Sequence, residues 1–97
     1  MDEDGYPEIE TLIRITEWPW ADAEACLDRI FELWHFETGA QKYPANETTV
    51  YRFATGGWSG NEDLIAALKA NTMIWLLTWH MSQRGGLHVF HVTPLRD

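Results

Sequence analysis

The stretch HMSQRGGLHVFHV, His80–Val92, decides the fold expected for this chain. Gly85 and Gly86 separate two runs rich in apolar and aromatic residues, and two consecutive glycines supply the positive-φ positions of a two-residue hairpin turn. The last two strands should therefore pair antiparallel. The expected cross-strand pairs are Arg84 with Leu87, Met81 with Phe90, His80 with His91, and Trp79 with Val92.

The sequence before Gly85 and Gly86 predicts two strands with a helix between them, and the second of these strands is the first strand of the hairpin. Apolar residues alternate over residues 72–82, TMIWLLTWHMS, which favours a strand. Residues 48–55, TTVYRFAT, are β-branched and aromatic and also indicate a strand. Between them, residues 61–71 place Leu64, Ile65 and Leu68 on one helical face. The expected core face of the hairpin carries Trp79, Met81, Phe90 and Val92.

The N-terminal half adds one strand and the clearest helix. Residues 9–18, IETLIRITEW, indicate a strand after a solvated acidic tail over residues 1–8. Residues 18–39 change period and predict a helix between Pro19 and Gly39. Pro44 and Asn46 predict a loop over residues 40–48. The apolar stripe of the predicted helix consists of Ala23, Cys26, Leu27, Ile30 and Trp34.

The predicted order βαβαββ defines an α+β fold with a mainly antiparallel sheet and two helices on one of its faces. A chain of 97 residues with 45% hydrophobic content is expected to form one domain, here residues 9–97. The single cysteine, Cys26, excludes an intramolecular disulfide. The acidic N-terminus does not resemble a signal peptide, and the run MIWLL is far shorter than the roughly 20 residues of a membrane span. A cytosolic protein without a membrane partner is expected.

Acidic residues dominate the charge and suggest the kind of partner. The formal net charge of −8 disfavours direct binding of nucleic acid and favours a protein with a basic surface. Glu24, Asp28 and Glu32 follow one another at i,i+4 spacing on the predicted helix, where like charges destabilise it slightly. This acidic stripe is a candidate partner-binding surface. The alternative is that the carboxylates only keep a tryptophan-rich protein soluble.

The stretch TGGWSGNEDL, residues 55–64, is a second candidate site. Ser59 and Glu62 have the S-x-x-E spacing of a capping box, so SGNE is expected to begin the helix. Glu62 and Asp63 already occupy the positive end of that helix, which disfavours a phosphate-binding loop. Trp58 is either buried against the helix or an exposed anchor for a partner, together with Arg84. A small-ligand site would use Arg52, Trp58, Asn61 and Arg84.

No enzyme, metal or cofactor signature is complete in the sequence. His80 and His91 would supply two nitrogens, whereas a zinc site takes three or four protein ligands. Ser59 lies in G-W-S-G rather than the G-x-S-x-G of a nucleophile elbow. We therefore expect a non-enzymatic protein without metal or cofactor.

Three elements of the C-terminal half resemble a family of small tailed-phage and prophage proteins. The elements are TGGWSGNE at residues 55–62, the aromatic run at residues 75–79, and S-x-RGG at residues 82–86. The resemblance implies a phage protein in the host cytoplasm, and no catalytic residues come with it. It favours a binding module that modulates or inhibits a host protein, such as a defence protein. The alternative is a protein that binds a small ligand or nucleotide signal through the GGWSGNE loop.

Overall fold

Four strands form one antiparallel sheet in the order β1-β2-β4-β3. The strands are β1 (Ala40–Ala45), β2 (Thr48–Ala54), β3 (Trp79–Gln83) and β4 (Leu87–Val92). The structure is a computed structural model that describes residues 7–34 and 39–93. Residues 1–6 of the expected acidic tail lie outside the described residues.

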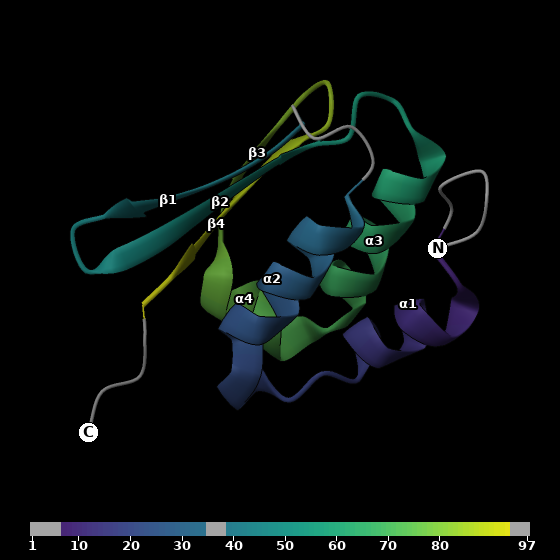
Figure 1. Ribbon diagram of the computed structural model, residues 1–97, viewed down its shortest axis with the longest axis horizontal. Helices are drawn as coiled ribbons and strands as arrows, with labels where there is room; N and C mark the ends of the chain where they lie inside the picture. Colours follow the sequence, from purple (N-terminus) through teal and green to yellow (C-terminus); the bar gives the residue numbers. More distant parts are fainter. Residues whose placement is uncertain (1–6, 35–38, 94–97) are drawn as a thin grey trace.

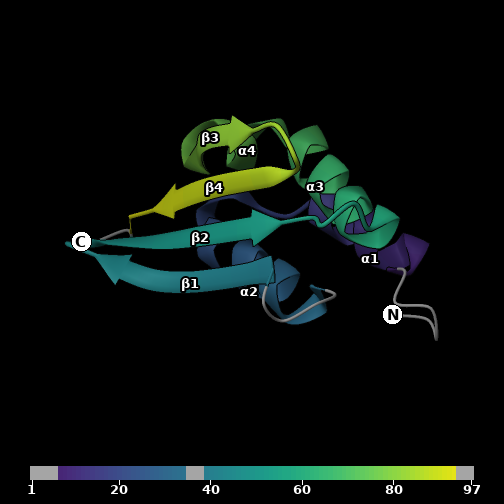
Figure 2. The ribbon, with the colours of Figure 1, turned by 90° about the horizontal axis from the view of Figure 1, so that it is seen from above.

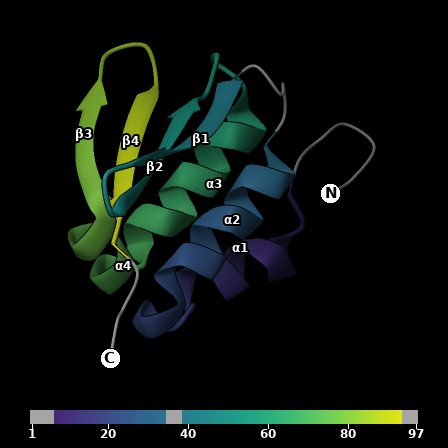
Figure 3. The same cartoon turned by 60° about the vertical axis from the view of Figure 1, so that its left-hand side comes forward.

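Among the described helices, α2, α3 and α4 lie on one side of the sheet, and α1 packs on α3 on that same side (Figures 1 and 3). No described helix covers the other side, which we call the open face. The described α-helices are α1 (Ile9–Thr16), α2 (Ala23–Leu33), α3 (Ser59–Ala70) and α4 (Thr72–Thr78), and a short 3₁₀ helix, η1 (Trp20–Asp22), precedes α2. The α+β class and the antiparallel sheet are confirmed, whereas the order βαβαββ and the pair of helices are not. Figure 2 shows the four strands side by side in the order β3, β4, β2 and β1. Among the described helices, none has the length and apolar character needed to cross a bilayer.

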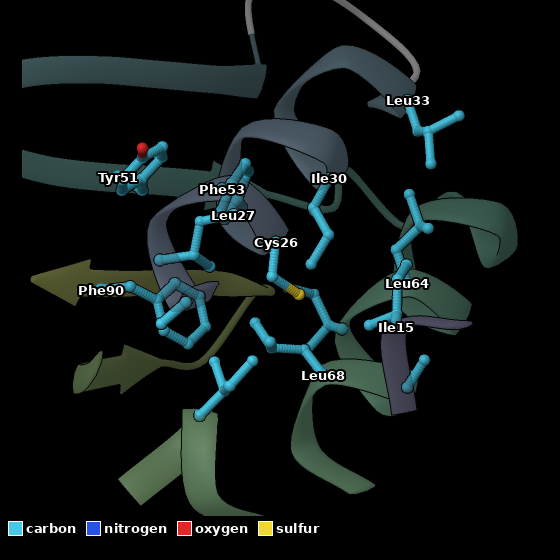
Figure 4. Close-up of a cluster of buried hydrophobic side chains, with 14 of the residues drawn as sticks. Ile15, Cys26, Leu27, Ile30, Leu33, Tyr51, Phe53, Leu64, Leu68 and Phe90 are labelled. Atoms are coloured by element: carbon cyan, nitrogen blue, oxygen red, sulfur yellow. The ribbon is translucent and has the colours of Figure 1, made fainter. Parts of the chain in front are cut away.

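The core lies between the sheet and the helices (Figure 4). Tyr51, Phe53 and Phe90 project from the sheet against α2 and α3, and their side chains are fully buried. Burying one large apolar side chain contributes about 1.5–3 kcal/mol, so this cluster holds the two layers together. The five residues of the expected apolar stripe are buried. The helix itself ends at Leu33, so Trp34 follows it, and residues 35–38 lie outside the described residues. Burial raises the pKa of the Cys26 thiol to about 12, which makes it unreactive.

The expected strand over residues 9–18 is wrong, because residues 9–16 form helix α1. Ile15 is completely buried, and Leu12 packs against the same core, so the apolar contacts recur with a spacing of three residues. The hydroxyl of Thr16 donates a hydrogen bond to the Leu12 carbonyl, 3.0 Å away, inside the helix. β-Branched residues lower helix propensity by less than about 0.7 kcal/mol each. Packing of α1 on α3 outweighs that penalty.

Residues 40–45 form the edge strand β1 rather than the expected loop. β1 pairs with β2 from Ala40 opposite Phe53 to Ala45 opposite Thr48. Pro44 is tolerated because an edge strand leaves one row of its amides without a partner strand. Asn46 has a φ of 61° and makes the turn into β2. The turn residue was recognised in the sequence, but the strand before it was not.

Residues 72–82 are divided between helix α4 and strand β3 and do not form one strand. The Asn71 side chain accepts a hydrogen bond from the Ile74 amide and starts α4 directly after α3. Trp79, with φ −62° and ψ 127°, returns the chain to an extended conformation. A short apolar run does not distinguish a buried strand from a helix by its period. The expected strand therefore begins seven residues late, at Trp79.

The antiparallel hairpin of β3 and β4 is confirmed, but its register differs from the expected one. Gln83 pairs with Leu87, so three residues, including Gly85 and Gly86, make the turn. Both glycines have positive φ, 93° and 90°. A bulge lies between Trp79, which pairs with Phe90, and Met81, which pairs with Val89. Met81 therefore does not share the core face of Phe90, as was expected. Neither Trp79 opposite Val92 nor Arg84 opposite Leu87 is observed.

Candidate functional site

The expected acidic stripe on α2 is largely bound within the molecule. Asp28 Oδ1 accepts a hydrogen bond from the Tyr51 hydroxyl at 2.6 Å and contacts Lys42 Nζ at 2.7 Å. Burial, and secondly the Asp28 carboxylate, raises the pKa of Tyr51, so the hydroxyl stays a donor. Glu32 pairs with Arg29 at 3.2 Å on the surface. Neutralising all three carboxylates would therefore disturb the contacts of Asp28 with Tyr51 and Lys42 of the sheet.

The four residues of the expected ligand site are not brought to one surface. Arg52 lies on the open face of the sheet, opposite Gln41 and Val89. Asn61 is completely buried at the start of α3. Trp58 is half-buried, and Arg84 is exposed in the β3–β4 turn. The loops do meet, because the Thr55 amide donates to the Gly86 carbonyl at 3.0 Å.

The expected capping box does not form. The residue that precedes α3 as its N-cap is Trp58, and it makes no side-chain cap hydrogen bond. Ser59 is already the first helical residue. The Glu62 amide donates instead to the Trp58 carbonyl at 3.1 Å. A side-chain cap is present one helix later, where Asn71 begins α4.

The outer side of α4 exposes large apolar side chains. Met73, Leu76 and Leu77 are 51%, 73% and 56% exposed, whereas Ile74 is completely buried. α4 has seven residues, which make slightly fewer than two turns, and five of them are large and apolar. These five side chains point to several sides of the helix, whereas the core covers only one side. Contiguous exposed apolar surface of this kind marks contact sites on soluble proteins.

Trp20 of η1 extends this apolar surface across a groove. The groove has a volume of about 250 Å³, and its walls include Trp20, Glu24, Leu77 and His91. Trp20 is 53% exposed. We call Trp20, Met73, Leu76 and Leu77 together the α4 surface. Glu24 places one carboxylate of the acidic stripe at its border.

Sequence reasoning missed the α4 surface because residues 72–82 were assigned to one strand. Asn71 is the signal that could have revealed it, since asparagine favours a helix N-cap. A helix beginning there has too few residues to bury Met73, Leu76 and Leu77 together with Ile74. Trp20 follows Pro19, which marks a helix start but does not show whether the ring is exposed.

A chain of hydrogen bonds links Trp79, Ser82 and His88 on the helix side of the sheet. Trp79 Nε1 donates to Ser82 Oγ at 2.8 Å, and Ser82 Oγ lies 2.8 Å from His88 Nδ1. A hydroxyl bonded to an imidazole resembles a nucleophile and base pair. Burial, and then the nearby Lys69, lowers the pKa of His88 and disfavours the imidazolium that proton transfer would create. Within the described residues, no carboxylate hydrogen bond to His88 is recorded, so the pair lacks the group that would stabilise this charge.

His80 and His91 are adjacent on the open face of the sheet. Their rings are stacked with centroids 4.0 Å apart and planes inclined by 11°. The bulge, rather than direct pairing, brings His80 over His91. Burial, and then His80, lowers the pKa of His91. In the part of the chain that the structure describes, no three His, Cys, Asp or Glu side chains gather as a metal site.

Comparison with protein-family models, with curated proteins and with solved structures found no match to this chain. The site is therefore interpreted from its own geometry.

Proposed function

We propose that this protein is a non-enzymatic binding module that contacts another protein through the α4 surface. The observation that carries the proposal is the exposure of Met73, Leu76 and Leu77 on one short helix beside Trp20. Tryptophan is among the residues that most often dominate the binding energy of protein interfaces, and large aliphatic side chains contribute when a partner removes them from water. A groove of about 250 Å³ is smaller than the 300 Å³ or more typical of small-molecule sites, and it fits one or two side chains of a partner.

The acidic surface supports a partner with a basic surface. The chain has a net charge of −8, and Glu24 borders the groove beside Trp20. A partner segment with an apolar side chain and a neighbouring lysine or arginine would fill the groove, pair with Glu24 and stack its cation on the Trp20 ring. The resemblance of the C-terminal half to phage proteins makes a host protein with a basic surface the expected partner, and modulation or inhibition of that protein the expected outcome.

The test is capture of the partner from host lysate, followed by its binding to variants of the α4 surface. Leu76→Ser and Trp20→Ala should each weaken binding by about ten-fold or more, since anchors of an interface contribute about 2 kcal/mol or more. Ile9→Ser is the matched control, because Ile9 is an equally exposed apolar residue on α1. Partner binding that is weakened equally by Ile9→Ser, or by none of the three, would refute the proposal.

The position of contact is tested separately with a photoreactive amino acid at residue 76 and at residue 9. Crosslinks to the partner from residue 76 alone support the α4 surface. Glu24→Gln should lower the association rate at low salt and have little effect at high salt, because exposed charges are screened over about 8–10 Å.

A further inference from the structure

The four strands carry no aspartate or glutamate, although the chain contains 15 of these residues. The carboxylates of the described residues lie on α1, η1, α2, α3 and the connecting segments, and Glu47 lies in the β1–β2 turn. Charge is therefore segregated between the helix layer and the sheet. The net charge of −8 belongs to the whole chain and disfavours binding of nucleic acid to its surface in general. It does not describe the open face of the sheet, because the strands carry no acidic residue.

Alternation along the strands defines which side chains lie on the open face. Tyr51 and Phe53 of β2 face the core, so Val50 and Arg52 face the opposite way. Their pairing partners on β1 and β4 share that face. Val50 and Val89 form its apolar floor and are buried under their neighbours. Gln41, Tyr43, Arg52, His80 and His91 are among the polar and aromatic side chains of the open face, and Met81 lies on it too.

Aromatic rings stand on both sides of Val50. Tyr43 lies opposite Val50 on one side and is 42% exposed. His91 lies opposite Val50 on the other side and is stacked with His80. Adjacent strands are about 4.8 Å apart, which places Tyr43 and His91 about 10 Å from each other. Arg52 lies two residues after Val50 on β2, and it forms no ion pair with another described residue.

We propose that the open face of the sheet binds single-stranded nucleic acid, with bases stacked on Tyr43 and on the His80–His91 pair and a phosphate bound by Arg52. Stacking on protein rings contributes to binding every base, whatever the sequence, and a flat sheet with separated rings suits an extended strand. An acidic peptide would use Arg52 but would gain nothing from the rings. The carboxylates of the helix layer lie on the other side of the sheet, and their repulsion is partly screened over about 8–10 Å. Glu24 comes closer, because it lines the same groove as His91.

The test measures fluorescence anisotropy of a labelled oligouridine of about ten nucleotides, a length within the usual site size. The wild-type protein should bind it saturably, and Tyr43→Ala should weaken binding by about five-fold or more. Arg52→Gln should weaken binding and reduce the slope of log K against log salt by about 0.7. Arg29→Gln is the matched control, because Arg29 lies on α2, in the helix layer, and should leave binding unchanged. Circular dichroism should show the wild-type fold in each variant; if Tyr43→Ala is unfolded, His80→Ala replaces it.

Several outcomes would overturn the inference. These are the absence of saturable binding, equal effects of Arg29→Gln and Arg52→Gln, or an unchanged affinity in folded Tyr43→Ala and His80→Ala. Binding of oligoglutamate in preference to oligouridine would assign the face to an acidic protein segment and equally overturn it. Trp20→Ala should leave oligouridine binding intact, and Tyr43→Ala should leave protein binding intact, so this inference and the proposed function fail separately.

Discussion

Helices α2 and α4 show opposite relations between their sequences and their surfaces. The acidic side chains of α2 first suggested a partner surface, yet Asp28 is bound to Tyr51 and Lys42 in the sheet. The sequence of α4, TMIWLLT, first suggested part of a strand, yet it forms a helix in which Ile74 and Thr78 are buried and the other large apolar side chains are not. The charged helix is thus partly satisfied within the molecule, and the apolar helix is not.

This difference shows what decides whether a side chain is available to a partner. A carboxylate on a packed helix lies close to the cations and hydroxyls of the neighbouring sheet and can pair with them. An apolar residue on a short helix has no such alternative once the core side is filled. Exposed apolar residues of α4 therefore indicate a contact surface more directly than the acidic residues of α2.

The largest expected effect tests the two sides of α4. Ile74→Ala should lower the free energy of unfolding by about 2–5 kcal/mol, because it opens a cavity beside fully packed neighbours. Leu76→Ala should change it by less than about 0.5 kcal/mol, because Leu76 is exposed. Denaturant melts of both variants provide the measurement. Equal losses at the two positions would contradict the orientation of α4.

The sequence predicted those elements whose pattern matches their packing. In α2 and α3 the apolar residues recur at helical spacing, and in β2 and β4 the β-branched and aromatic residues dominate. α1 was mistaken for a strand because its isoleucines and threonines favour β structure, while its contacts to α3 favour a helix. β1 was mistaken for a loop because its pairing with β2, rather than its own composition, makes it a strand.

The candidate site was less predictable than the fold, because its residues depend on these missed elements. Lys42 could not be matched to Asp28 while β1 was assigned to a loop. The proximity of His80 and His91 was predicted, but from a register that the bulge changes. Exposure of Leu76 and Leu77 depends on where α4 begins and ends, and the apolar run itself does not show this.

Asn71 provides the next largest effect, because it links α4 to α1. Its Nδ2 donates to the carbonyls of Ile15 and Trp18, both at 2.9 Å, while its Oδ1 caps α4. Asn71→Ala should lower the free energy of unfolding by about 2–3 kcal/mol, since each net hydrogen bond contributes about 1 kcal/mol. Ser59→Ala is the control at the start of α3 and should change stability by less than about 0.5 kcal/mol, because Ser59 caps nothing. Thermal melts that rank the two variants in the opposite order would contradict this assignment of the caps.

The contact of Asp28 with the sheet should have a somewhat smaller effect. Asp28→Ala should lower the free energy of unfolding by about 2 kcal/mol, because it leaves the Tyr51 hydroxyl without its charged acceptor. The half-exposed pair with Lys42 contributes less than about 1 kcal/mol of this. Glu32→Ala removes only the surface pair with Arg29 and should cost less than about 1 kcal/mol. A double-mutant cycle of Asp28→Ala with Tyr51→Phe measures the coupling, and a coupling near zero would refute it.

The smallest expected effect is a pH dependence of the contact between α4 and the sheet. His88 packs edge-on against the Trp75 ring of α4, with centroids 6.4 Å apart, and hydrogen-bonds to Ser82. Burial, and then Lys69, lowers its pKa in the folded state, whereas an unfolded histidine titrates near pH 6.5. Between the folded-state pKa of His88 and about pH 6.5, the unfolded chain therefore binds more protons than the folded one. The stabilising effect of the neutral His88 in the folded protein is therefore complete above about pH 6.5 and is lost as the pH falls through the folded-state pKa.

His91, whose pKa is also lowered, acts in the same direction, so variants must separate the two residues. His88→Gln should reduce the slope of unfolding free energy against pH below about 6.5, and His88→Gln with His91→Gln should reduce it further. Near neutral pH both imidazoles are already uncharged, so the remaining difference between variants there reports lost packing and hydrogen bonds rather than titration. Denaturant melts over a pH series separate these contributions. A slope that is the same in wild type and in the double variant would mean that neither histidine links protonation to folding, and that the contact of α4 with the sheet does not depend on a neutral His88.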